Sequence, residues 1–168
     1  GTAELAHSAA QVIGVDVASE AVSYAAAQYA RFNTRFVQAS GTALPFPDAS
    51  FDLITAFEVI EHLTDWQNLL QEVRRLLRPA GQFIVSTPNK LYYAETREKA
   101  GPNPFHTHEF TFEEFNQALQ DVFPSVSMFL QNHSDAMVFQ PVGGQQVAET
   151  KLDTGQPKPE EAHFFMAV

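Results

Sequence analysis

The sequence predicts an α/β fold: a doubly wound, Rossmann-like, mostly parallel sheet with an antiparallel C-terminal strand. Two observations carry this prediction. Short apolar runs that suit buried strands alternate with longer amphipathic segments that suit helices, which is typical of a parallel sheet with helices on both faces. Near the C-terminus two strand-like runs follow each other without a helix between them, and this order predicts an antiparallel pair.

Local patterns along the chain define the individual elements. The run QVIGVD at 11–16 predicts a first strand, and Ser19 can cap the alanine-rich helix that follows it. Residues 65–78 predict a helix with one apolar face, which the turn residues at 79–81 are expected to end. The other predicted elements are strands at 35–39, 52–57, 82–87, 125–131 and 162–168 and a helix at 111–122.

Two segments lack the regular spacing of apolar residues that predicts a helix or a strand. Residues 89–110 hold aromatic, proline and glycine residues without a repeat, so we expect a lid or insertion beyond the carboxyl ends of the strands. Residues near 141–160 are rich in Gly, Gln, Lys and Pro, which predicts a flexible loop. The 168 residues as a whole fit a single domain.

Composition narrows the classes of partner. The net charge of −10 disfavours nucleic acid and anionic lipid, so we expect a small-molecule partner. The absence of cysteine excludes disulfides and zinc–thiolate sites and suits a cytoplasmic protein. No apolar run approaches the ~20 residues of a membrane span.

Side chains at the predicted strand ends are the candidate ligand-binding groups, because ligands of open α/β sheets bind there. Asp16 ends the first strand, where it could accept both hydroxyls of a ribose or simply favour a helix N-terminus. In EVIEHL, Glu58, Glu61 and His62 follow the strand at 52–57 with i, i+3, i+4 spacing. That group could hold a divalent cation, serve as a general base or play only a structural part.

Three stretches together resemble one family: VIGVDVASEAV, FVQASGTALPFPDASFDLITAFEVIEHL and LLRPAGQFIVSTPN. They are similar to signature stretches of the class I S-adenosylmethionine (SAM)-dependent methyltransferases, of the subgroup with a type 11 or type 23 domain. The resemblance implies a seven-stranded sheet of order 3-2-1-4-5-7-6, SAM as cofactor and methyl transfer as the activity. It also implies a cofactor site made of Asp16 (ribose), Val17 (adenine), Ser40, Gly41 and Thr42 (adenine loop), and Phe57 and Glu58 (methionine end).

One part of the family pattern is missing. Members begin with a strand and a glycine-rich turn, whereas GTAELAHSAA at the start of this chain resembles the helix that follows that turn. We therefore expect an N-terminally incomplete domain that lacks the first strand of the family fold.

A second resemblance concerns the histidines of NPFHTHEF. Together with EVIEH and STPN, they resemble small-RNA 2′-O-methyltransferases, in which such residues hold magnesium; EVIEH also resembles ubiquinone-biosynthesis O-methyltransferases. This implies a divalent metal site of Glu58, Glu61, His62 and His106, with His106 or His62 as the alternative catalytic base.

The function expected from these patterns is methyl transfer from SAM to a small-molecule acceptor, on an oxygen of a metabolite or sugar. The alternative is a methyltransferase-like domain that binds without turnover.

Overall fold

The structure is a computed structural model that describes residues 1–93, 103–132, 136–139, 149–152 and 158–168. The chain divides into two compact units. The first contains residues 1–52 and 65–81, and the second contains residues 53–64 and 82–168. In the described part of the chain, no helix combines the length and the apolar character needed to cross a bilayer.

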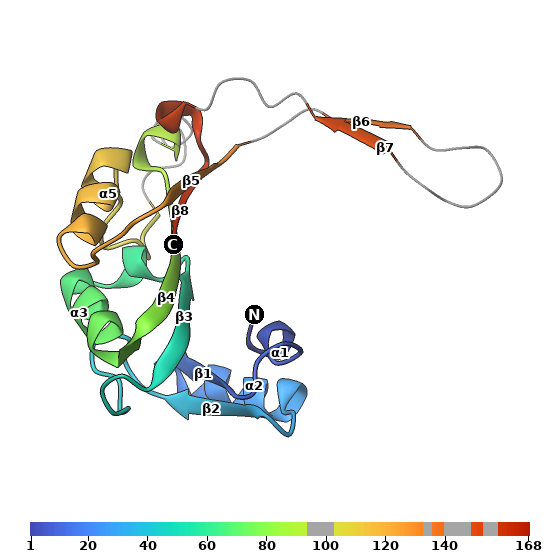
Figure 1. The fold of residues 1–168 in the computed structure, drawn as a ribbon, viewed down its shortest axis with the longest axis vertical. Helices are drawn as coiled ribbons and strands as arrows, with labels where there is room; N and C mark the ends of the chain where they lie inside the picture. Colours follow the sequence, from blue (N-terminus) through green and yellow to red (C-terminus); the bar gives the residue numbers. More distant parts are fainter. Residues whose placement is uncertain (94–102, 133–135, 140–148, 153–157) are drawn as a thin grey trace. The chain divides into compact units, whose positions relative to one another are not determined.

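The first unit contains a two-stranded parallel sheet. Strand β1 (Val12–Asp16) pairs with β2 (Thr34–Gln38), so that Asp16 lies opposite Gln38. Helices α1 (Thr2–Leu5) and α2 (Ser19–Tyr29) pack on these strands (Figure 1). Gly14 is required here, because a Cβ at this position would lie 2.8 Å from the ring of Phe36. The parallel pairing predicted from the sequence is confirmed for these two strands.

The start of α2 differs from the prediction. Ala18, not Ser19, is the N-cap, and the Ser19 hydroxyl donates to Glu20 instead (3.1 Å). Asp16 takes over part of the capping, because its Oδ1 accepts a hydrogen bond from the Ala18 amide at 2.8 Å. The acid at the strand end therefore also organises the turn into the helix.

Helix α3 (Trp66–Leu76) buries Leu69, Leu70, Val73 and Leu76. The first three belong to the predicted apolar face, whereas Leu77, the fourth residue expected there, is the first residue of β4 (Leu77–Pro88). The turn expected at residues 79–81 is wrong, because β4 begins directly after the helix. The residue before a proline is biased toward extended backbone, and proline itself fixes a φ that a strand tolerates. The Arg78–Pro79 pair therefore favours extended backbone directly after the helix.

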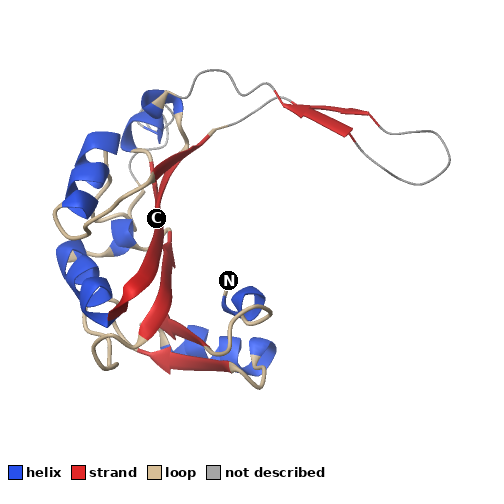
Figure 2. Ribbon diagram, in the orientation of Figure 1, coloured by secondary structure: helices blue, strands red, loops and turns tan. Residues whose placement is uncertain are grey.

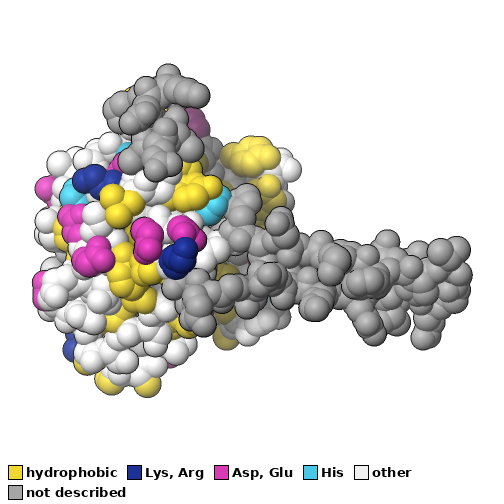
Figure 3. Space-filling model, turned by 90° about the horizontal axis from the view of Figure 1, so that it is seen from above, with side chains coloured by type: hydrophobic (Ala, Val, Ile, Leu, Met, Phe, Trp, Pro, Cys, Tyr) yellow, Lys and Arg dark blue, Asp and Glu magenta, His cyan; other side chains and the backbone are white. Residues whose placement is uncertain are grey.

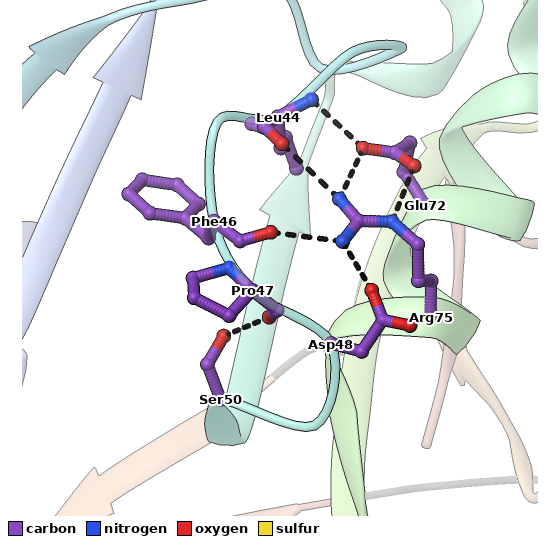
Figure 4. A network of polar contacts seen from close by, with 7 residues as sticks. All are labelled: Leu44, Phe46, Pro47, Asp48, Ser50, Glu72 and Arg75. Carbon is purple, nitrogen blue, oxygen red and sulfur yellow. Dashed lines mark hydrogen bonds and ion pairs between the residues drawn. The ribbon is translucent and has the colours of Figure 1, made fainter.

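An ionic network holds the loop before β3 to α3 (Figure 4). Arg75 donates to both carboxylate oxygens of Glu72 and to Asp48, at 2.7–2.8 Å. It also donates to the carbonyls of Leu44 and Phe46, at 3.1 and 2.8 Å. The planar guanidinium is the side chain whose fixed donors suit such a set of acceptors.

The second unit is built on a four-stranded sheet of order β3-β4-β8-β5 (Figure 2). Its outer strands are β3 (Phe51–Phe57) and β5 (Met128–Gln131). Strand β8 (Phe164–Ala167) is antiparallel to both β4 and β5. The predicted antiparallel C-terminal strand is therefore confirmed, and the fold class is α/β as expected.

Aromatic side chains form the core of this unit. Helix α5 (Phe112–Gln120) begins at Thr111, whose hydroxyl accepts from the Glu114 amide at 3.3 Å. Phe115 of this helix and Phe110 just before it are fully buried with Phe165 of β8. Ring packing of this kind adds about 0.5–1.5 kcal/mol per pair beyond area burial.

Three further short elements lie toward the C-terminal end of the described chain. Strands β6 (Ala136–Phe139) and β7 (Glu149–Leu152) form an antiparallel pair, and η2 (Pro159–Glu161) precedes β8. Strand β7 falls inside the range 141–160 for which the sequence predicts a flexible loop; residues 141–148 and 153–157 of that range lie outside the described residues. So do residues 94–102 of the predicted lid.

Candidate functional site

The turn that follows β3 holds a strained glutamate. Glu58 has a φ of +54°, in the left-handed region that non-glycine residues avoid at a cost of about 1–2 kcal/mol. Its amide donates to the Ser86 carbonyl at 3.2 Å, and its Oε1 accepts from the Ser86 hydroxyl at 2.6 Å. Ser86 therefore holds both the backbone and the side chain of Glu58 in this conformation.

The next acid, Glu61, is buried. It belongs to the short helix η1 (Ile60–His62), and only 1% of it is exposed. Its Oε2 accepts from the Thr87 hydroxyl at 3.3 Å, whereas its Oε1 has no hydrogen-bond partner among the described residues. Burying a carboxylate oxygen without a partner is costly, so this oxygen is available for a ligand.

Backbone hydrogen bonds bring His106 to η1. The Glu61 carbonyl accepts from the amides of Thr107 (2.8 Å) and His108 (3.1 Å). It also accepts from the Thr107 hydroxyl at 3.2 Å. These bonds fix the segment that carries His106, and the rings of His62 and His106 lie 5.0 Å apart, edge to face.

Both rings are oriented by a hydrogen bond at Nδ1. In His62, Nδ1 lies 2.8 Å from the carbonyl oxygen of Phe105, which can only accept, so this nitrogen carries the proton. In His106, Nδ1 lies 2.9 Å from the carboxylate of Glu109, which fixes the same tautomer. Each neutral ring is therefore left with an Nε2 lone pair.

The electrostatics of the cluster disfavour negative charge. Burial raises the pKa of Glu61 above its ordinary value, against opposing effects of hydrogen bonding and of the two histidines. Burial also raises the pKa of Glu58, and the charge of Glu61 adds to this shift. Raised carboxyl pKa values beside histidines in one cluster are typical of sites that bind ligands or transfer protons.

Glu61, His62 and His106 also form a group that could hold a metal ion. They offer one ligand atom each, and these atoms lie within 4.8 Å of one another. His62 Nε2 lies 3.9 Å from Glu61 Oε1, the oxygen without a partner among the described residues. Glu58, which the sequence also suggested as a ligand, is not in this group; its carboxylate is engaged by Ser86.

The candidate cofactor residues of the first unit lie at the carboxyl ends of β1 and β2. The Asp16 carbonyl accepts from the Ala39 amide at 3.0 Å, so Ser40 follows on the strand end next to Asp16. Val17 is 71% exposed, and the hydroxyls of Ser40 and Thr42 lie 2.8 Å apart.

These groups together suit a nucleoside: an accessible carboxylate, an exposed apolar side chain and two hydroxyls. Gly41 lies between the two hydroxyl residues. Phe57 and Glu58 belong to the second unit, so their place in the same cofactor site stays a prediction.

The residues that support Glu58, Glu61 and His106 were not predicted from the sequence. Glu109 orients His106, while Ser86 and Thr87 hold the two glutamates. Glu109 could have been found as the acid three residues after His106, and Ser86 and Thr87 lie in the STPN stretch. No sequence signal points to the Phe105 carbonyl as the partner of His62.

Comparison with known proteins places the chain in a family. A family profile described as a methyltransferase domain matches residues 1–85. A probable SAM-dependent methyltransferase of Mycolicibacterium smegmatis is 40% identical over 116 residues, which are 69% of this chain and 44% of that protein. Another, Rv3030 of Mycobacterium tuberculosis, is 40% identical over 121 residues, 71% of this chain and 43% of that protein.

A solved structure shares the fold. The SAM-dependent methyltransferase of Mesorhizobium loti aligns with a TM-score of 0.65 at 19% identity, over 97% of this chain and 81% of that one. The chain spans less than half the length of the two mycobacterial relatives. With the profile match over residues 1–85 and these relatives, the chain belongs to the type 11 methyltransferase domain family of SAM-dependent methyltransferases.

Proposed function

We propose that this protein transfers a methyl group from SAM to an oxygen of a small-molecule acceptor. The observation that carries the acceptor side of the proposal is the pair of histidines, His62 and His106, each with Nδ1 tied to an acceptor and Nε2 left to bind a proton. They lie beside the strained turn after β3, in a domain of a methyltransferase family.

The proposed SAM site lies at the carboxyl ends of β1 and β2. When bound, SAM supplies a methyl group on a sulfonium sulfur; the acceptor attacks the methyl carbon in line with its bond to sulfur, and S-adenosylhomocysteine leaves. Asp16 binds the ribose hydroxyls through the carboxylate oxygen that does not accept from Ala18. Val17 packs against the adenine, and the loop from Ser40 to Thr42 supplies hydroxyls to its edge. For Phe57 and Glu58, which belong to the second unit, a role at the methionine end stays an expectation of the family resemblance.

The acceptor half needs a base, because a hydroxyl must lose its proton as the O–CH3 bond forms. His106 suits this role, since Glu109 orients the ring and stabilises the imidazolium that proton transfer creates. His62 is the alternative base, with the Phe105 carbonyl in the orienting role.

The surface charge supports a small acceptor. Acidic side chains lie next to exposed apolar ones on the face shown in Figure 3, and the net charge is −10. Such a surface repels phosphate backbones. A small hydroxyl-bearing metabolite or sugar therefore suits the protein better than a nucleic acid.

Calorimetry with SAM and with S-adenosylhomocysteine tests the cofactor half. Asp16→Ala and Asp16→Asn are each expected to weaken binding by about 1–3 kcal/mol, the usual loss for hydrogen bonds to a charged group. Asp16→Asn keeps an oxygen for the Ala18 amide and so separates ligand binding from the local turn. Asp52→Asn, which alters an exposed ion pair with Arg78, is the matched control.

Two results would overturn the proposal. An unchanged dissociation constant in both Asp16 variants removes the ribose role. Tight SAM binding without release of S-adenosylhomocysteine, across a panel of hydroxyl-bearing metabolites and sugars, would instead support a domain that binds without turnover.

A further inference from the structure

We infer that Glu61, His62 and His106 form a binding site for a divalent transition-metal cation, with Glu109 as the residue that positions one of its ligands. The inference stands on the geometry of these side chains. Only the cation's part in catalysis, given below, rests on the proposed function.

The ring orientations are the first argument. A metal-binding histidine commonly donates its other ring N–H to a carboxylate or a backbone carbonyl, which fixes the tautomer and the direction of the ligating nitrogen. Both arrangements are present: Glu109 accepts from His106 Nδ1, and the Phe105 carbonyl accepts from His62 Nδ1. Each ring is left with Nε2 as its ligand atom.

The buried carboxylate is the second, independent argument. Glu61 is 1% exposed, and its Oε1 has no hydrogen-bond partner in the described part of the chain. It lies 3.9 Å from His62 Nε2. Two ligand atoms that each bind a cation at about 2.1 Å lie up to about 4.2 Å apart, so this pair fits around one ion.

The positions of all three ligands require only a small adjustment. Their atoms lie within 4.8 Å of one another. A distance of 4.8 Å between two ligand atoms is less than one ångström longer than the greatest distance between two ligands of one ion. A rotation of the half-exposed His62 side chain can remove this difference.

The ligand types select the class of cation. Two imidazoles and one carboxylate suit Zn²⁺, Co²⁺, Fe²⁺ and their neighbours, whereas Mg²⁺ and Ca²⁺ prefer oxygen ligands alone. A site with two histidines and one glutamate also leaves a coordination position open, as catalytic zinc sites do. Glu58, which the sequence also suggested as a ligand, remains held by Ser86.

In methyl transfer the open position would take the acceptor oxygen. A hydroxyl bound to the cation loses its proton to solvent more readily than a free one. Its oxygen then forms the bond to the methyl carbon as the bond from carbon to sulfur breaks, and S-adenosylhomocysteine leaves. The cation thus does for the acceptor what a single histidine base does without it.

Metal binding by the 168-residue chain tests the inference without SAM or acceptor. Metal-free protein is titrated with Co²⁺, followed by its visible absorption, and with Zn²⁺ and Mg²⁺ by calorimetry. We expect one Co²⁺ or Zn²⁺ per chain, release of protons on binding, and much weaker binding of Mg²⁺. Glu61→Gln, His62→Asn and His106→Asn should each weaken Co²⁺ binding by more than tenfold, and Glu109→Gln by about 10–100-fold.

His108→Asn is the matched control. His108 lies two residues from His106 and also has a carboxylate partner, Glu114 at 2.7 Å, but it is not in the cluster. Its variant should bind Co²⁺ as the wild type does. If a cluster variant does not fold, the NMR ring resonances of His62 and His106 in the wild-type protein provide the test instead. Bound paramagnetic Co²⁺ must shift or broaden the resonances of both rings.

Three results would overturn the inference: no Co²⁺ or Zn²⁺ binding by the wild type, equal loss in His108→Asn and the cluster variants, or Mg²⁺ binding as tight as Zn²⁺ binding. Failure of SAM binding together with intact Co²⁺ binding would count against the proposed function alone. Intact methyl transfer in the presence of a chelator would leave the metal site but remove its catalytic role.

Discussion

The Arg75 network of the first unit and the Glu61 cluster of the second unit handle charge in opposite ways. Arg75 donates to two carboxylates and two backbone carbonyls, and its hydrogen bonds to Glu72 lower the pKa of that carboxyl group. In the Glu61 cluster two carboxyl groups lie near each other with raised pKa values, and a buried oxygen lacks a partner among the described residues.

The Arg75 network is a group of charges that holds the structure together, whereas the Glu61 cluster is one that we propose to be functional. A cation that is matched to its acceptors holds a loop on a helix, and a bound ligand would add little to the stabilisation of these charges. A buried carboxylate with raised pKa next to two oriented imidazoles stores an unfavourable energy that a bound proton, cation or substrate relieves. Charge alone does not mark a site; charge that the fold leaves unsatisfied does.

The largest effect is expected for turnover. His106→Ala should lower methyl transfer by about 10²–10⁴-fold, since it removes the base or a metal ligand, and should leave SAM affinity nearly unchanged. Initial rates and SAM calorimetry measure the two quantities. Equal losses of turnover and of SAM affinity would show that His106 acts on the cofactor or on folding.

The next effect concerns stability. Arg75→Ala and Arg75→Lys should both lower the melting temperature by several degrees, because neither side chain can serve the loop and Glu72 together. Arg78→Ala, which removes only the exposed pair with Asp52, should change it much less. A melting temperature that Arg75→Lys leaves unchanged would mean that a point charge suffices.

The pH dependence of stability should have opposite signs in the two regions. The pKa of Glu61 is raised in the folded state, so protonation of this carboxyl group stabilises the fold. The contribution is fully present below the ordinary carboxyl pKa of 4.5, and it is lost as the pH rises through the pKa of the folded state. The pKa of Glu72 is lowered, so its contribution is present above 4.5 and lost as pH falls.

Urea denaturation between pH 4 and about 7 in a chelator measures these trends. The stability of the wild type relative to Glu61→Gln should increase toward low pH, and its stability relative to Glu72→Gln should decrease. Parallel trends for the two variants would contradict the distinction between the regions.

The smallest effect concerns strained backbone. Each region has one non-glycine residue in the left-handed region, Ala49 at a φ of +51° and Glu58 at +54°. Glycine relieves about 1–2 kcal/mol of strain but gives the unfolded chain more freedom, so Ala49→Gly should stabilise by roughly 0.5 kcal/mol. Glu58→Gly should likewise keep the protein folded yet lower methyl transfer, whereas Ala49→Gly should not.

How far the sequence predicts the structure differs between elements. The helices α2, α3 and α5 and the strands β1–β5 and β8 followed from local apolar periods, and the antiparallel last strand followed from their order. The strands β6 and β7 were not predicted. The start of β4 did not, because a Pro–Gly stretch can turn a chain or extend it, and neighbouring strands decide which. The cap of α2 also failed, since Asp16 competes with Ser19 for the same turn.

The sequence by itself determined the class of the fold and the residue types of the two candidate sites. These are an acid at the end of β1 in the first unit and, in the second, two glutamates with a histidine after β3 and a second histidine some forty positions later. Only the tertiary structure decided that His106 lies against His62, because three hydrogen bonds to the Glu61 carbonyl dock a distant segment on η1. It alone chose the tautomers, through Glu109 and the Phe105 carbonyl, and left Glu61 Oε1 buried without a partner in the described chain. Spacing along a chain fixes which side chains share a turn, whereas the distance between turns and the burial of each atom depend on how the whole unit packs.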